Sequence, residues 1–265
     1  MGNLTALVTG ASGGLGYAIA ELLGAKKFDL VVVSRSVKKL ETMKIDFQKR
    51  WGITVTVIAA DLASPKGAQS VFDACQKKKI TIDILVNNAG SGLFGENMDQ
   101  KIDDVTSMIR LNINALTELC MLFGKAMKER GSGRILNIAS LVGTFAVPFF
   151  SVYAATKAFV ISYSRSLRSE LRPAGVSVSV FLPGYIKTGF DDNAGVASEG
   201  YKKISGAAGM SAQKVARSAV KTVLAGRALA VAGLTNRIGY FVMKIIPKQI
   251  LSHLVFVMMR NVTKR

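Results

Sequence analysis

The sequence predicts a single-domain α/β fold built on a doubly wound parallel sheet. Short runs rich in Val, Ile and Leu alternate with longer helix-like segments between residues 4 and 184. The runs are almost continuously apolar, which is typical of strands that are buried on both faces of a parallel sheet. Regular alternation of such strands with helices is typical of doubly wound sheets.

The expected strands are LTALVTG (4–10), FDLVVVS (28–34), TVTVIAA (54–60), IDILVNN (82–88), GRILNIAS (133–140) and VSVSVFLPG (176–184). Helices are expected at 14–26, 37–51, 66–78, 103–130, 153–171 and 211–226, the last with Ser211 as its N-cap. The sequence shows no internal repeat and no linker. We therefore expect one domain at 1–235 with a substrate loop at about 189–210, followed by an apolar, basic helical extension at 236–265.

The composition excludes several kinds of chemistry. The chain has 265 residues, 49% of them hydrophobic, which is enough for a sizeable core. One histidine and two cysteines leave little material for a metal centre or a Ser/His/Asp mechanism, and we expect no metal. The first strand begins at Leu4, which we take to exclude a signal peptide, and the few cysteines suit a reducing cytoplasm.

The charge is strongly basic and unevenly distributed. The net charge is +18, and no Asp or Glu follows Glu199. Such asymmetry favours an acidic partner, a membrane surface or nucleic acid, although a solvated basic face explains it equally well. No recognition helix or base-stacking pattern is present, so we expect no nucleic-acid partner.

A glycine-rich loop, TGASGGLG (9–16), follows the first strand and opens the first helix. Gly10 would allow the tight turn, Gly14 would let the backbone approach a pyrophosphate, and Gly16 would pack helix against strand. The helix N-terminus would then bind the phosphates of a dinucleotide. The second strand ends in Ser34 and Arg35, where a cofactor without a 2′-phosphate usually meets a carboxylate. An arginine can bind a phosphate through two hydrogen bonds, so we expect NADP(H) in preference to NAD(H).

Tyr153 and Lys157 in YAATK lie one helical turn apart, on the same face of the expected helix. Alone, such a pair is usually a solvated surface pair. Here it follows TGASGGLG, Asp61, NNAG (87–90), Asn112 and Ser140, and it precedes PGYIKT (183–188). With these motifs in this order, the chain resembles the short-chain dehydrogenase/reductase family over about residues 4 to 190.

The resemblance implies a Rossmann-like fold and a catalytic set of Tyr153, Lys157, Ser140 and Asn112. Tyr153 would carry the proton, because the Lys157 ammonium favours the phenolate and lowers the phenol's pKa. Lys157 would also bind the nicotinamide ribose, and Ser140 would hold the substrate oxygen. Asn112 would link the lysine to solvent through its backbone carbonyl and a water; Asn114 is a competing candidate. Members of the family are commonly homodimers or homotetramers.

The resemblance also implies the cofactor contacts, which are carried over position by position. They are Gly10, Ser12, Gly14, Leu15, Gly16, Ser34, Arg35, Asp61, Leu62, Asn88, Ala89, Gly90, Pro183, Gly184, Ile186 and Thr188, together with Tyr153 and Lys157.

The expected wall of the substrate pocket is apolar: Leu93, Phe94, Val142, Val147, Phe149, Phe150 and Tyr185. Such a wall suits a lipid, acyl or steroid-like ketone. We therefore expect NADP(H)-dependent interconversion of a hydrophobic ketone and its secondary alcohol. The alternatives are a 3-oxoacyl thioester reductase and a non-catalytic NADPH-binding scaffold on a membrane surface.

The last segment, GYFVMKIIPKQILSHLVFVMMRNVTKR (239–265), is apolar but is broken by Lys244, Pro247, Lys248 and His253. Its longest uncharged run is too short to span a bilayer. Three interpretations remain open: packing on the body or on a dimer partner, peripheral anchoring at a membrane, and covering the substrate cleft.

Overall fold

The computed structural model describes residues 3–187, 190, 194 and 209–263. Its centre is a seven-stranded sheet, ordered β3-β2-β1-β4-β5-β6-β9, in which every neighbouring pair is parallel. The strands are β1 (Thr5–Thr9), β2 (Asp29–Ser34), β3 (Val55–Ala59), β4 (Ile84–Asn87), β5 (Gly133–Ile138), β6 (Val176–Leu182) and β9 (Leu229–Val231). The chain winds outward from β1 to β3 and returns to place β4 on the other side of β1. This reversal is the switch point at which doubly wound sheets bind ligands.

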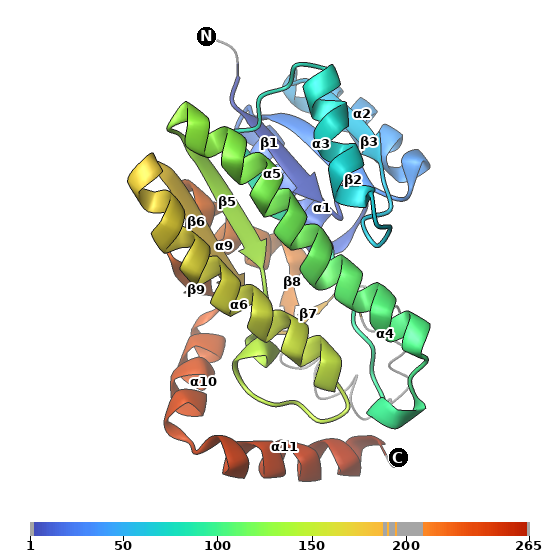
Figure 1. The fold of residues 1–265 in the computed structure, drawn as a ribbon, viewed down its shortest axis with the longest axis vertical. Coiled ribbons are helices and arrows are strands. Elements are labelled where there is room, and N and C mark those ends of the chain that lie inside the picture. The colour runs from blue at the N-terminus through green and yellow to red at the C-terminus, as the bar shows by residue number, and fades with distance from the viewer. Residues whose placement is uncertain (1–2, 188–189, 191–193, 195–208, 264–265) are drawn as a thin grey trace.

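Helices cover both faces of the sheet (Figure 1). One face packs against α1 (Gly14–Ala25), α2 (Val37–Trp51) and α9 (Ala212–Leu224), and the other packs against α3 (Gly67–Lys77), α5 (Ala115–Arg130) and α6 (Ser151–Leu171). Successive residues of β1 alternate between the two cores: Ala6 and Val8 enter one, and Leu7 enters the other. The expected doubly wound fold is thus confirmed.

All six expected strands are present, but the seventh was missed. β9 has only three residues and pairs with the end of β6. A run this short carries too little periodicity to be recognised from sequence. A separate pair of two-residue strands, β7 (Ile186–Lys187) and β8 (Met210–Ser211), lies beside the sheet. Ser211 caps α9 as expected, since its hydroxyl accepts from the Lys214 N–H at 3.4 Å.

The helix expected at 103–130 is interrupted. It consists of α4 (Ile102–Ile109), a π-helical turn (Arg110–Asn114) and α5. The π turn contains Asn112, which is buried, whereas Asn114 is exposed. Single π turns are frequent at functional sites, and this one packs against α6.

Two further helices end the described chain: α10 (Leu234–Ile245) and α11 (Lys248–Thr263), with Pro247 between them. In Figure 1, α11 crosses the end of the molecule toward which β5 points. The described residues also form three short 3₁₀ turns, at Asn97–Asp99 (η1), Leu141–Thr144 (η3) and Arg172–Ala174 (η4). Across the residues placed in this structure, no helix is both long and apolar enough to cross a membrane.

Candidate active site

The glycine loop after β1 adopts backbone conformations that favour glycine. Gly10 has φ +66° and Gly14 has φ +54°. A Cβ on Gly10 would lie 2.9 Å from Asn88 Nδ2, and a Cβ on Gly16 would collide with the carbonyl oxygen of Gly10. Gly10 makes the tight turn as expected. Gly16 is required mainly because it packs against the loop itself and Asn88, which the sequence did not indicate.

Thr9 and Asn88 join this loop to the NNAG segment after β4. The Thr9 hydroxyl donates to Val86 O at 3.3 Å and accepts from the N–H groups of Asn88 and Ala89, both at 3.0 Å. Asn88 Nδ2 donates to Thr9 O at 3.0 Å. Two motifs that are distant in the sequence therefore form one rigid unit at the switch point. Thr9 was not among the expected site residues.

The start of α1 fits a pyrophosphate. The N-cap residue, Gly13, provides no side-chain cap, the first turn contains no acidic residue, and nothing lies within 4 Å of a Cβ added to Gly13. The N–H groups of this first turn and the positive end of the helix dipole form an anion site. Ser12 is partly exposed beside the turn, whereas the Leu15 side chain is buried in the core, so Leu15 could contact a cofactor only through its backbone.

The residues expected around an adenosine lie at the ends of β2 and β3. Arg35 is exposed, and Ser34 is partly buried, with its hydroxyl accepting from Ser36 N–H at 3.2 Å. The exposed Asp61 accepts from Ala63 N–H at 3.0 Å, which fixes the turn after β3. Leu62 is buried in the core.

Tyr153 and Lys157 lie on the same side of α6. Lys157 Nζ is 5.8 Å from the centre of the Tyr153 ring and donates to Ile138 O at 3.1 Å. Only 5% of Lys157 is exposed, and this burial lowers its pKa from 10.5 to about 8. At pH 7 the group remains largely an ammonium ion, held where desolvation disfavours its charge.

Asn112 connects the π turn to α6 and to the loop after β4. Its side-chain amide donates to Ser91 O at 2.8 Å and to the Thr156 hydroxyl at 3.0 Å, and its Oδ1 accepts from Ser91 N–H at 3.0 Å. A Cβ on Gly90 would lie 3.1 Å from Asn112 Oδ1 and 3.3 Å from Lys157 Nζ. Asn112, Gly90 and Lys157 are therefore brought together, as the motif order predicts.

Ser140 follows β5 and begins the η3 turn. Its hydroxyl accepts from Val142 N–H at 3.4 Å. The turn packs closely on α6, because a Cβ on Gly143 would lie 2.6 Å from the carbonyl carbon of Lys157 and 2.8 Å from Ala158 N. Gly143 thus permits the contact that brings the Ser140 turn against the helix carrying Tyr153 and Lys157. Nothing in the sequence marked it.

The PGYIKT segment follows β6. Pro183 is buried, and its carbonyl oxygen accepts from Leu141 N–H at 3.0 Å, which ties this segment to the Ser140 turn. Gly184 lies against the side chain of Asn236 in α10, and Ile186 lies in β7. Thr188 and most of the loop expected at 189–210 lie outside the described residues.

An aromatic cluster surrounds Tyr153. Of the expected pocket residues it contains Phe94, Val142, Val147, Phe149 and Phe150. Leu93 and Tyr185 do not belong to it; Tyr185 lies instead beside Gly209. Phe190, which was not expected, packs 5.5 Å from the Tyr153 ring, and Phe150 packs at 5.9 Å.

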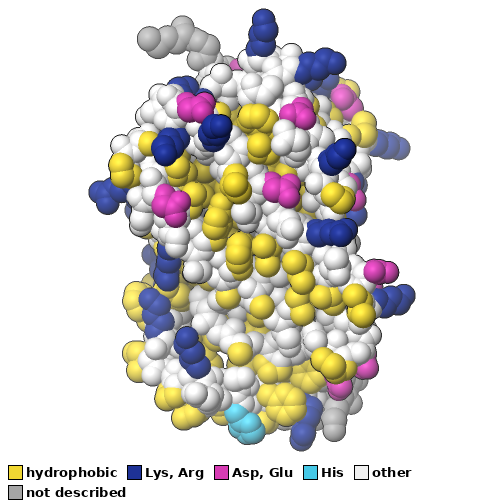
Figure 2. Space-filling view, viewed as in Figure 1, with side chains coloured by type: hydrophobic (Ala, Val, Ile, Leu, Met, Phe, Trp, Pro, Cys, Tyr) yellow, Lys and Arg dark blue, Asp and Glu magenta, His cyan; other side chains and the backbone are white. Residues whose placement is uncertain are grey.

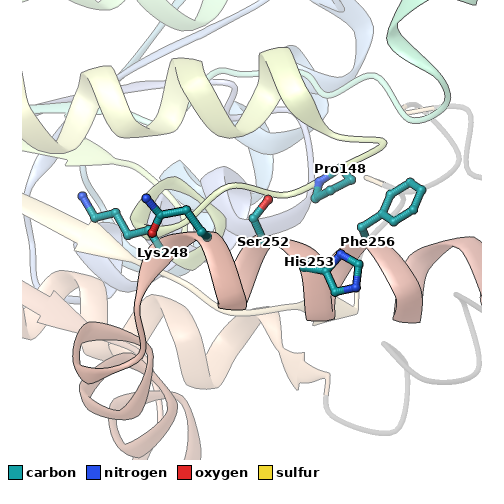
Figure 3. A pocket seen from close by; sticks show the side chains of 6 residues that line it. Pro148, Lys248, Ser252, His253 and Phe256 are labelled. Atoms are coloured by element: carbon teal, nitrogen blue, oxygen red, sulfur yellow. The ribbon is translucent and has the colours of Figure 1, made fainter.

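The inner side of α11 closes this cluster. Val255 and Met259 pack into it, and Phe256 stacks on Phe149 with ring centres 6.1 Å apart. Beside them lies a groove of about 600 Å³ (Figure 3). It is lined by Pro148, Lys248, Gln249, Ser252, His253 and Phe256. The two C-terminal helices thus pack on the body through Tyr240, Val255 and Met259, and α11 lies over the aromatic cluster. In the sequence, the four-residue spacing of Leu251, Val255 and Met259 was the one pattern that could have predicted this inner side of α11.

A parallel sheet with this switch point and glycine loop defines a Rossmann-like α/β protein. The family described as short chain dehydrogenase matches residues 4–198, and the chain belongs to that family. It is similar to ketoacyl reductase HetN of Nostoc sp., with 38% identity over 182 residues, covering 69% of this chain and 63% of the relative. It is 32% identical to human 17-beta-hydroxysteroid dehydrogenase type 3, covering 69% of this chain and 59% of that protein. The match therefore spans about three fifths of the length of these relatives.

Solved structures agree with the fold. A short-chain dehydrogenase from Sphingobium yanoikuyae in complex with NADPH superposes with a TM-score of 0.81 at 28% identity, covering 92% of this chain and 97% of that one. The bulky-bulky ketone specific alcohol dehydrogenase from Comamonas testosteroni gives 0.76 at 27% identity, covering 94% and 96%.

Proposed function

We propose that this protein is an NADP(H)-dependent oxidoreductase that interconverts a hydrophobic ketone and its secondary alcohol. The observation that carries the proposal is the surroundings of Tyr153. Its ring belongs to an apolar aromatic cluster, and the buried Lys157 ammonium lies 5.8 Å from the ring centre. A proton-carrying phenol would then stand between an apolar substrate site and a cationic group.

Bound NADPH would supply the hydride to the carbonyl carbon. Tyr153 donates its phenolic proton to the substrate oxygen as negative charge develops there. The Ser140 hydroxyl donates a hydrogen bond to the same oxygen and orients it. Lys157 stabilises the resulting phenolate, and the Asn112 turn provides the route by which the proton is replaced. Oxidation of the alcohol reverses these steps.

The residues present fit the cofactor. The start of α1 would hold the pyrophosphate, and Gly90 and Lys157 would lie beside the nicotinamide ribose. Arg35 is exposed at the end of β2, where its guanidinium can bind a 2′-phosphate in two-point contact. The NADPH in the Sphingobium yanoikuyae neighbour supports the same preference.

The substrate class follows from the cluster and from the relatives. Five of the expected pocket residues surround Tyr153, which favours a lipid, acyl or steroid-like ketone over a sugar. The ketoacyl and hydroxysteroid names of the relatives support this class. A 3-oxoacyl thioester is the second candidate, favoured by the ketoacyl reductase and by the human very-long-chain 3-oxoacyl-CoA reductase, at 33% identity.

A non-catalytic NADPH-binding scaffold is the rival from another class. Such a protein would have no need to bury Lys157 beside Tyr153 at the energetic cost that its lowered pKa implies. We also propose a homodimer or homotetramer, as is common in the family. Both cysteines are buried as free thiols, which supports the expected cytoplasmic location.

The deciding experiment compares the wild type with Tyr153→Phe. We expect the variant to lose NADPH oxidation with every ketone by about a thousandfold or more, because the proton donor is absent. NADPH affinity, followed by cofactor fluorescence, should remain within about twofold, because the phenol adds little to cofactor binding. Turnover retained by the variant would remove Tyr153 from the mechanism.

A further inference from the structure

Helices α10 and α11 are apolar on two sides, although each lies at the surface. Their inner sides pack on the body: Tyr240 joins the core under α6, and Met259 joins the cluster around Tyr153. Their outer sides expose a second apolar set, here called the C-terminal patch. It comprises Leu234, Ile238, Phe241 and Ile245 of α10 and Ile250, Leu254, Val257 and Met258 of α11.

The spacing shows that the patch follows the outer sides of the two helices. The α10 members recur every three or four residues, which places them on a single side of the helix. Phe241 is 63% exposed and Ile245 is 83% exposed, whereas Tyr240 is 6% exposed. Ile250 and Leu254 repeat the pattern on α11, next to the buried Leu251. A surface helix that needed only the body as its partner would have a polar outer side.

The charged side chains that α10 and α11 carry are all basic. Arg237, Lys244, Lys248 and Arg260 lie on these two helices, and the chain contains no Asp or Glu after Glu199. Figure 2 shows hydrophobic, basic and histidine side chains together at the end of the molecule where α10 and α11 lie. The few acidic side chains visible there lie over the opposite edge, near α4.

Two occupants can cover such a patch, and the charge decides between them. A symmetric contact with a second copy would set the basic residues of one patch against the equally basic patch of the other, and like charges across an interface are unfavourable. An anionic lipid surface accepts both features: the acyl region takes the apolar side chains, and the headgroups pair with the cations. We propose that the C-terminal patch docks this protein on an anionic membrane.

Docking would place the active site next to lipid. The inner side of α11 closes the cluster around Tyr153, and the groove lined by Ser252, His253 and Phe256 opens along the same helix (Figure 3). A long apolar ketone could then enter from the bilayer without crossing water. This consequence rests on the proposed function, whereas the docking itself does not.

The test is co-sedimentation of the full chain with vesicles. We expect binding to equimolar phosphatidylglycerol/phosphatidylcholine vesicles and about tenfold weaker binding to phosphatidylcholine alone or in high salt. Phe241→Ser with Ile245→Ser should weaken binding about tenfold or more, because both side chains leave the acyl region. The matched control is Ile45→Ser on α2, an equally apolar and exposed position (68%) that should bind as wild type.

The charge is tested separately. Lys244→Gln should weaken binding about fivefold, and Lys77→Gln on the far helix α3 should not. Circular dichroism and NADPH oxidation with a short water-soluble ketone should be unchanged in all four variants. If the wild type also shows no NADPH oxidation with this ketone, the proposed function fails, whereas the docking is still tested by vesicle binding.

Three results would overturn the docking. The first is absence of vesicle binding by the wild type. The second is equal binding by the patch variant and Ile45→Ser. The third is a wild-type assembly, seen by light scattering, that Phe241→Ser with Ile245→Ser dissociates while vesicles bind neither protein; the patch would then be a subunit interface.

Discussion

Replacing Lys157 by Met should change how the stability of the cofactor-free protein depends on pH. Lys157 is buried beside Tyr153, and burial lowers its pKa from 10.5 to about 8. In the unfolded chain the same amine has its ordinary value. Between these two values the unfolded state binds more protons than the folded state, so stability rises with pH in that window.

The magnitude follows from the two pKa values. Below pH 8 the folded protein carries the full cost of a buried ammonium, about 3 kcal/mol at about 1.4 kcal/mol per pKa unit. Most of this cost disappears as the pH rises from 8 to 10.5. Lys157→Met removes the charge and retains the length of the side chain. We therefore expect the free energy of unfolding of the wild type, relative to that of the variant, to rise by about 2.5 kcal/mol between pH 7 and pH 10.

The assay is denaturant unfolding of both cofactor-free proteins at pH 7, 8, 9 and 10, followed by circular dichroism. Loss of the hydrogen bond to Ile138 O also affects the variant, so the change of the difference with pH is the informative quantity. The control Lys77→Met removes an exposed lysine of α3, far from this site, and should keep the wild-type slope. A constant difference between wild type and Lys157→Met across this range would refute the buried ammonium.

Three further predictions concern the cofactor, the packing of the site and the substrate. Arg35→Ala should weaken NADPH binding about tenfold or more and NADH binding very little, because a charge-assisted contact to the 2′-phosphate is lost; equal losses in a fluorescence titration would contradict this role. Gly143→Val should lower both kcat and the melting temperature, since its Cβ would lie 2.6 Å from the Lys157 carbonyl carbon, whereas the control Gly239→Ala meets only Met243 Cε at 3.4 Å. Met259→Ser should raise KM for a bulky apolar ketone by about tenfold and leave a small ketone unaffected, because Met259 closes the cluster around Tyr153; a uniform rise in steady-state assays would count against that.

The sheet was predictable from sequence because its strands are buried on both faces. The runs containing Leu7, Val32 and Val86 are apolar without alternation, a pattern that few other structures require. β9 was not predicted because three residues at the edge of the sheet show no periodicity. The π turn was not predicted for a related reason. Asn112 is a poor helix former, but this fact alone does not show that the backbone forms a π turn around it.

The sequence indicated candidate residues by the chemistry of their side chains, and it did not indicate the residues that matter through packing. Tyr153, Lys157 and Ser140 have recognisable side chains in a recognisable order. Gly143 and Thr9 matter because of what they touch, and those contacts join segments distant in the sequence. The same holds for α11, whose inner side reaches Tyr153 only after the whole sheet has formed. Sequence spacing places side chains on one element but does not determine which elements meet.

The proposed function requires that Tyr153 and its surroundings reduce hydrophobic ketones with NADPH. The most direct measurement is initial-rate oxidation of NADPH and NADH, followed by absorbance, against small diketones, 3-oxoacyl thioesters and steroid ketones. We expect turnover with NADPH on the bulky apolar compounds and a kcat/KM with NADH that is lower by about tenfold or more. Tight NADPH binding without turnover on any of these substrates would contradict the proposed reductase function and favour a cofactor-binding scaffold.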